Sequence, residues 1–105
     1  MQVIKCLAEK IAEELHDAED YIDLALKWKE EDEDTADLFA ELSAEEMKHV
    51  NMLHEHVEEM IDDYREENGA PPKDMMTLYE YLHEKHMKDA MRIKVKQGMY
   101  KEKET

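Results

Sequence analysis

The sequence contains little that would break a helix or cross-link a fold: two glycines, two prolines and one cysteine in 105 residues. So few glycines and prolines exclude a protein built from many β-turns, and the abundant Ala, Leu, Glu, Lys and Met favour long helices. The single Cys6 cannot form a disulfide within the chain, which favours a reducing compartment. Charges interrupt the first ten residues, unlike a signal peptide, and no segment approaches the roughly 20 apolar residues of a membrane span. We therefore expect a soluble, cytoplasmic, all-α protein without a membrane partner.

Basic residues are also scarce, with 14 Lys and Arg against 29 Asp and Glu and a formal net charge of −15. A nucleic-acid partner needs a basic face, so this composition argues against one. The charge is uneven, because residues 1–84 carry a net −19 whereas residues 85–105 carry a net +4. An acidic surface can gather cations, but it is equally the ordinary solvated face of a helical protein.

Hydrophobic periodicity predicts three helices, at about residues 2–30, 36–67 and 75–97. They form one domain over residues 1–98, followed by a basic and frayed tail over residues 99–105. At roughly 1.5 Å per residue the first two helices are each about 45 Å long, and a shorter third helix cannot cover both apolar seams. We therefore expect a long antiparallel helical hairpin plus a third helix, with a four-helix bundle completed by dimerisation or higher homo-oligomerisation.

The helix boundaries follow from local signals. Thr35 is the expected N-cap of the second helix and Asp74 that of the third. The stretch Asn68-Gly-Ala-Pro-Pro72 provides a glycine C-cap followed by prolines, and Gly98 is expected to end the third helix. Apolar residues recur at heptad spacing in the first helix and form its seam: Ile4, Leu7, Ile11, Ala18, Tyr21, Ala25 and Trp28. Ala8, Leu15 and Ile22 flank this seam.

Four polar residues interrupt these apolar seams: Glu14 in the first helix, and Glu46, His49 and His56 in the second. A polar group inside an apolar seam costs several kcal/mol unless it is compensated. In an antiparallel hairpin, a turn centred between residues 30 and 31.5 brings Glu14, Glu46 and His49 to one height, and the seam breaks there. The Glu-x-x-His spacing of Glu46 and His49 also places both on one helical face.

This cluster has two explanations. A buried polar group can fix helix register, as a seam asparagine does in coiled coils. A two-fold dimer, however, would bring four carboxylates and two histidines into one core, where they need protons, water or cations. Carboxylate and imidazole ligands together suit Fe, Mn or Zn. We therefore favour a metal site.

The motif resembles the first half of a ferritin or rubrerythrin bundle. In that superfamily a Glu followed by a Tyr, here Glu14 and Tyr21, precedes a Glu-x-x-His motif, here Glu46-Met-Lys-His49. The resemblance covers about residues 5–65, and the absence of a fourth helix and second half is similar to the three-helix encapsulated ferritins. Those proteins build a di-iron centre across a dimer interface and reside in a protein nanocompartment. Residues 99–105 contain no recognisable cargo peptide for an encapsulin shell.

The resemblance implies that Glu14 and Glu46 are carboxylate ligands, His49 an imidazole ligand, and Tyr21 a near-site tyrosine. It selects iron over Mn or Zn and implies a ferroxidase that oxidises Fe(II) to Fe(III) for iron storage or detoxification. The alternative function is a non-enzymatic helical oligomerisation module, and a third is a metal-binding regulator without turnover. Tyr21 is equally explained as a seam aromatic.

Further candidate ligands lie outside this set. Glu13 and His16 flank Glu14 and either pass ions inward or simply face solvent. Glu80 and His83 repeat the Glu-x-x-His spacing in the third helix, with His86 nearby. A turn near residue 71 places His83 level with residue 59, too far along the axis to join the first site. It would instead pair with His56 or Asp63 in a secondary site, unless this polarity is only that of a helix surface.

Overall fold

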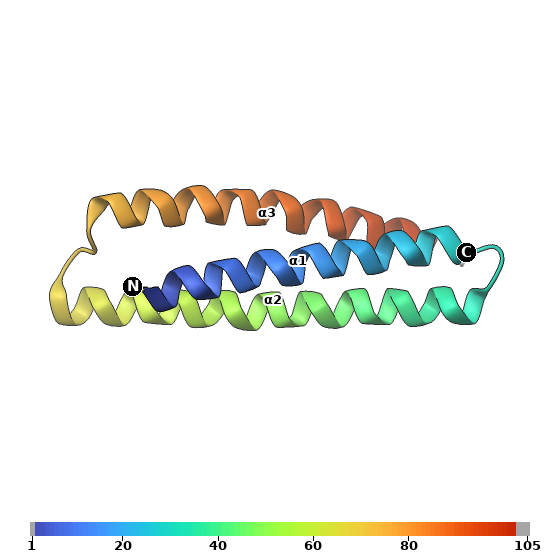
Figure 1. Cartoon of the computed structure of the whole chain (residues 1–105), viewed down its shortest axis with the longest axis horizontal. Helices are drawn as coiled ribbons and strands as arrows, with labels where there is room; N and C mark the ends of the chain where they lie inside the picture. Colours follow the sequence, from blue (N-terminus) through green and yellow to red (C-terminus); the bar gives the residue numbers. More distant parts are fainter. Residues whose placement is uncertain (1, 103–105) are drawn as a thin grey trace.

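Three long helices make up the computed structural model, which describes residues 2–102. They are α1 (Gln2–Trp28), α2 (Glu33–Asn68) and α3 (Lys73–Glu102), and these described residues contain no strand (Figure 1). The rod that they form measures 55 × 21 × 17 Å. The predicted all-α class and the helical hairpin are therefore confirmed. None of the helices in this range combines the length and apolar character that a membrane span requires.

The core lies mainly between α1 and α2. On α1 the predicted stripe is buried as Ile4, Ala8, Ile11, Leu15, Ala18, Ile22 and Ala25. Small residues, including Ala18, Ala25 and Ala36, are fully buried and let the two helices approach closely. Tyr21 and Trp28, at the edge of the stripe, are only half-buried.

The connection between α1 and α2 is short and capped. The Asp32 carboxylate accepts hydrogen bonds from the Thr35 amide, at 3.1 Å, and from the Thr35 hydroxyl, at 2.8 Å. These hydrogen bonds, and the one from the Thr35 backbone amide most strongly, lower the pKa of the Asp32 carboxyl. The predicted N-cap was therefore wrong: Asp32 is the cap, and Thr35 lies three residues inside the helix. Glu33 and Asp34 lie in the first turn of α2, where acidic side chains interact favourably with the helix dipole.

The connection between α2 and α3 follows the prediction more closely. Gly69 adopts φ +80° and its amide donates to the carbonyl of Arg65, so the glycine C-cap is confirmed. The start of α3 differs, because the carbonyl of Pro72 accepts from the amides of Met75 and Met76. The helix therefore begins at Lys73, and Asp74 lies inside its first turn instead of capping it.

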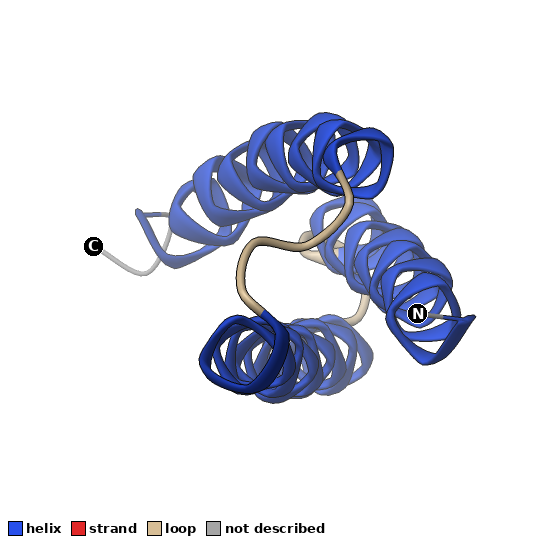
Figure 2. Ribbon diagram, turned by 90° about the vertical axis from the view of Figure 1, so that its left-hand side faces the viewer, coloured by secondary structure: helices blue, strands red, loops and turns tan. Residues whose placement is uncertain are grey.

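α3 packs on α1 and touches α2 only slightly (Figure 2). Its helix does not end at Gly98 but continues to Glu102. Tyr100 explains the difference: its ring is buried, its hydroxyl donates to the Asp37 carboxylate, and the Lys29 ammonium lies 5.4 Å from the ring centroid. The predicted frayed tail is therefore wrong over residues 99–102, and its remaining residues, 103–105, lie outside the described residues.

Polar contacts join the C-terminal half of α3 to α1. Arg92 donates to both oxygens of Glu19, at 2.6 and 2.8 Å, and Lys96 reaches Glu19 at 3.0 Å and Asp23 at 2.8 Å. The Arg92 bond, reinforced by Lys96, lowers the pKa of Glu19 to about 2. The basic end of the chain is thus used in ion pairs with the acidic face of α1.

One buried serine links all three helices. The Ser43 hydroxyl, on α2, donates to the carbonyl of Ala18 on α1 at 2.7 Å and accepts from the Gln97 amide group on α3 at 3.0 Å. Ser43 is fully buried, and its bond to Ala18 is buried while that from Gln97 is partly buried. They fix the height of α3 relative to the hairpin at this level.

Candidate metal centre

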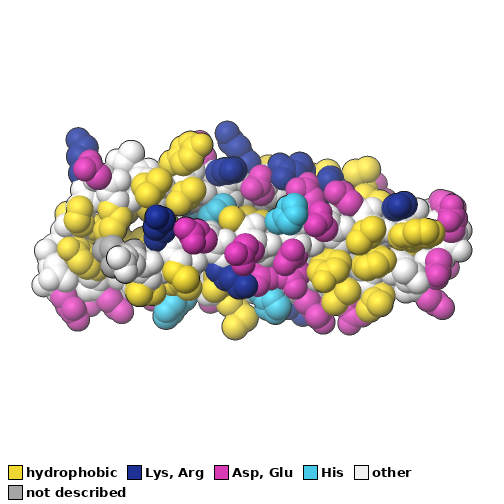
Figure 3. Space-filling view, in the orientation of Figure 1, with side chains coloured by type: hydrophobic (Ala, Val, Ile, Leu, Met, Phe, Trp, Pro, Cys, Tyr) yellow, Lys and Arg dark blue, Asp and Glu magenta, His cyan; other side chains and the backbone are white. Residues whose placement is uncertain are grey.

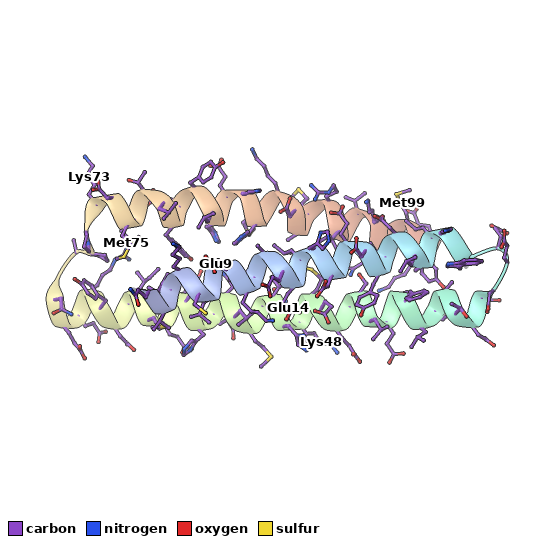
Figure 4. The ribbon with its side chains drawn as sticks, in the orientation of Figure 1. Glu9, Glu14, Lys48, Lys73, Met75 and Met99 are labelled. Carbon is purple, nitrogen blue, oxygen red and sulfur yellow. The ribbon has the colours of Figure 1, made fainter. Side chains whose placement is uncertain are left out.

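The hairpin brings Glu14 of α1 to the same height as Glu46 and His49 of α2, as the position of the turn predicted. Glu14 lies at the boundary between α1 and α2 in Figure 4. His49 Nδ1 lies 3.5 Å from an oxygen of Glu14 and 3.7 Å from an oxygen of Glu46. Among residues 2–102, these three side chains form the group of metal-ligand type whose ligand atoms all lie within 4.8 Å of one another. The sequence therefore predicted correctly that these three residues lie close enough to form a possible metal site.

The burial of the three side chains fits a cation better than a simple ion pair. Glu14 and Glu46 are 15% and 19% exposed, whereas His49 is 53% exposed. Among the residues that the structure describes, Oε2 of Glu46 is buried and has no hydrogen-bond partner. A buried carboxylate oxygen without a partner is destabilising, because it has lost water and gained nothing. A metal ion held by two carboxylates and an imidazole would supply the missing interaction.

The cluster opens to the surface of the hairpin. A hollow of about 250 Å³ beside it is lined by Lys10, Glu14, His49, Met52 and Leu53. Lys10 lies 3.9 Å from the second oxygen of Glu14 and forms a 3.2 Å ion pair with Glu13. These two glutamates, with Glu13 the larger influence, raise the pKa of the exposed Lys10 ammonium. The lysine is thus a local counter-ion that an incoming metal would displace.

Other residues that the sequence singled out lie outside this cluster. Tyr21 stacks on Phe39, with ring centroids 6.2 Å apart, as expected for a seam aromatic. Glu13 and His16 are exposed, and His16 forms an ion-pair contact with Asp20 at 3.3 Å. His56 is exposed, so its expected position inside the α2 seam was wrong. His56 lies outside the buried stripe of α2, which includes Val50, Val57 and Ile61.

The expected secondary pairings of His83 were also wrong. Glu80 is exposed, and His83 packs against neither His56 nor Asp63. It stacks instead on His54 of α2, with ring centroids 4.6 Å apart, and on Tyr79, at 5.8 Å. His83 therefore meets α2 five residues closer to the first site than its sequence height predicted.

His54 is the residue that the sequence reading missed. Its signal was present, because His54 interrupts a second stripe of α2 whose buried members are Met47, Val50, Val57 and Ile61. That stripe faces the interior between the helices, and His54 lines a cavity there together with His83 and His86. Burial lowers the pKa of His86, and neighbouring His83, Lys85 and His54 lower it further against the opposing effect of Asp89.

The chain as a whole stands apart in comparisons with known proteins. It matches no protein-family model, no curated protein and no solved structure.

Proposed function

We propose that two copies of this chain form a di-metal carboxylate site that oxidises Fe(II) to Fe(III). The observation that carries the proposal is the convergence of Glu14, Glu46 and His49 around a buried, unpartnered carboxylate oxygen. Two carboxylates and one imidazole are a ligand set suited to Fe, Mn and Zn, and the likeness of the motif to ferritins favours iron.

A single chain offers only half of the ligands that such a centre uses. Di-iron sites in helical bundles take a Glu-x-x-His pair from each of two helices and one glutamate from each of two others. Glu46 and His49 supply one such pair and Glu14 supplies one further glutamate. A second copy related by a two-fold axis would complete the set, and four carboxylates would balance the charge of two divalent ions.

The face that carries the site has apolar surface available for such a dimer. Apolar side chains lie on both sides of its charged middle in Figure 3. Heptad spacing from Glu14 and Glu46 places partly buried apolar residues on this face: Leu7, Tyr21, Phe39, Leu53 and Met60. Burying them between two hairpins would be favourable at about 25 cal/mol per Å² and would also dry the site.

Iron is the substrate in this proposal. Fe(II) entering the site gives an electron to O₂ or to a peroxide, and the Fe(III) formed is released or stored. Glu14 and Glu46 hold the ion through hard oxygen ligands, which favour the higher charge of the product, while His49 contributes nitrogen at the solvent edge. The net charge of −15 would draw cations toward the surface.

The test is Fe(II) oxidation followed by absorbance of Fe(III), together with the iron content of the purified protein. Glu14→Ala, Glu46→Ala and His49→Ala should each abolish stoichiometric iron binding and fast oxidation while keeping the helical circular-dichroism signal. Glu45→Ala and His56→Ala are matched controls, because both residues are exposed on α2. If the three ligand variants oxidise Fe(II) like the controls, the proposal fails.

Assembly provides a second test. A metal held by both chains binds the dimer and not the monomer, so it must favour association by mass action. Sedimentation at micromolar protein should show a tighter or larger assembly with Fe(II), or with a redox-inert divalent ion, than with chelator. An unchanged dissociation profile alongside confirmed metal binding would place the site within one chain. Iron binding without turnover would instead support a metal-binding regulator.

A further inference from the structure

We propose a second metal site, for a borderline transition metal such as Zn(II), Ni(II) or Cu(II), held by the imidazoles of His54, His83 and His86 between α2 and α3. The three side chains line one cavity of about 160 Å³, which is otherwise mainly apolar. An all-imidazole set selects Zn, Cu or Ni rather than a hard cation. The site is thus distinct in place and chemistry from the carboxylate cluster of Glu14 and Glu46.

The spacing of the rings already suits coordination from two helices. His54 and His83 have ring centroids 4.6 Å apart and ring planes 18° apart. Metal–nitrogen bonds of roughly 2.0–2.1 Å in tetrahedral to right-angled geometry place two such centroids about 4.5–5.2 Å apart. The ligand nitrogens of the three histidines do not all lie within 4.8 Å of one another, so side-chain rotation has to bring them together. The stacked rings have to turn about their Cβ–Cγ bonds, which have broad torsional minima.

The third ligand and the state of the rings are also favourable. His86 follows His83 by three residues, so both lie on the same face of α3. Imidazole binds metal only in its neutral form. Nε2 of His54 lies 3.1 Å from a carboxylate oxygen of Glu58. A carboxylate that accepts from one ring nitrogen fixes the tautomer and leaves the other nitrogen free to bind a metal.

The position of the site gives it a structural consequence. α3 as a whole touches α2 only slightly, and its ion pairs to Glu19 and Asp23 of α1 lie in its C-terminal half. A metal bound by His54 and by the two α3 histidines would join this half of α3 to α2. Metal binding would therefore lock the third helix against the hairpin.

The experiment uses full-length, untagged protein carrying Glu46→Ala and His49→Ala, so that the carboxylate site cannot bind. Zn(II) titration by calorimetry should still show one site per chain, and Co(II) should give the absorption spectrum of a nitrogen-ligated ion. His54→Phe and His83→Phe, added separately, keep a ring for stacking but remove the ligand. Each should weaken Zn(II) binding by roughly tenfold or more.

The matched control is His56→Phe, because His56 is an exposed histidine on the same helix. It should bind Zn(II) like the background protein, and circular dichroism should show all variants equally helical. The proposal is overturned if the background protein binds no Zn(II), or if His54→Phe and His83→Phe both bind like His56→Phe. Because Glu46 and His49 are already removed, either result leaves the Fe(II) oxidation proposal to its own test.

Discussion

Replacing Glu46 by methionine should make the metal-free protein more stable while abolishing metal binding at the carboxylate cluster. Within residues 2–102, Oε2 of Glu46 is buried without a hydrogen-bond partner, and Nδ1 of His49, at 3.7 Å, lies beyond hydrogen-bond distance. Methionine has a similar length, is flexible and needs no partner.

The size of the effect follows from the burial. An unsatisfied buried polar group costs about 1–3 kcal/mol, and Glu46 is still 19% exposed, which favours the lower part of this range. We therefore expect the metal-free variant to gain about 1–2 kcal/mol. For a domain of about 100 residues this raises the midpoint of thermal unfolding by about 5–10 °C.

Metal should reverse the order of thermal stability of the parent and Glu46→Met. A ligand present at 100 times its dissociation constant stabilises the parent by about 2.7 kcal/mol, more than the expected gain of the variant. Thermal unfolding at pH 8, followed by circular dichroism with chelator and with a redox-inert divalent ion, measures both states. The parent should melt below Glu46→Met in chelator and above it with saturating metal.

Glu45→Met is the matched control, because Glu45 is the neighbouring glutamate and is exposed. A surface substitution away from a special contact changes stability by about 0.5 kcal/mol or less, so its midpoint should stay close to that of the parent. If Glu46→Met is less stable than the parent in chelator, the carboxylate is not a destabilised ligand. The metal argument would then lose its main support.

Three further predictions concern the packing of α3. Gly98→Ala should raise the free energy of unfolding in urea by about 0.5–1 kcal/mol, because Gly98 is helical and a Cβ there meets nothing within 4 Å. A lower free energy of unfolding would show that α3 ends before Gly98. Ser43→Ala should cost about 1–2 kcal/mol, since it removes the partner of the Gln97 amide; an unchanged midpoint would mean that water replaces it. Glu19→Gln should destabilise the protein at pH 7 but not at pH 2, because the pKa of Glu19 is lowered from 4.5 to about 2 by Arg92 and the stability is lost as pH falls through that range. A gap between the thermal midpoints of parent and Glu19→Gln that is equal at both pH values would contradict this.

The carboxylate site could be predicted from sequence because it depends only on the hairpin. Two long helices with a short connection have one possible antiparallel register, so the turn at residues 29–32 fixes which residues face each other. Glu14, Glu46 and His49 then meet whatever the third helix does. The same logic gave the buried stripe of α1, since a period of 3.6 residues defines one apolar face.

The position of α3 could not be predicted in this way, because its seam is weak. Leu78 and Met87, which the sequence placed in that seam, are about half exposed, and only Ile93 and Tyr100 are buried. What sets its height is a few polar contacts between distant residues, such as Gln97 with Ser43. The pairing of His83 with His54 and the continuation of the helix through Gly98 follow from these contacts, and local sequence carries no record of them.

The uneven attachment of α3 has a consequence for how the molecule opens. The hydrogen bonds from Arg92, Lys96, Gln97 and Tyr100 lie in its C-terminal half, whereas none of residues 73–85 is fully buried. Each backbone amide exchanges with solvent through the local opening that has the lowest free energy. We expect amides of the first half of α3 to exchange deuterium well before those of the second half, and the α1–α2 hairpin to exchange last. Although α3 is one continuous helix, its two halves would thus open as separate cooperative units, with the boundary close to Asp89.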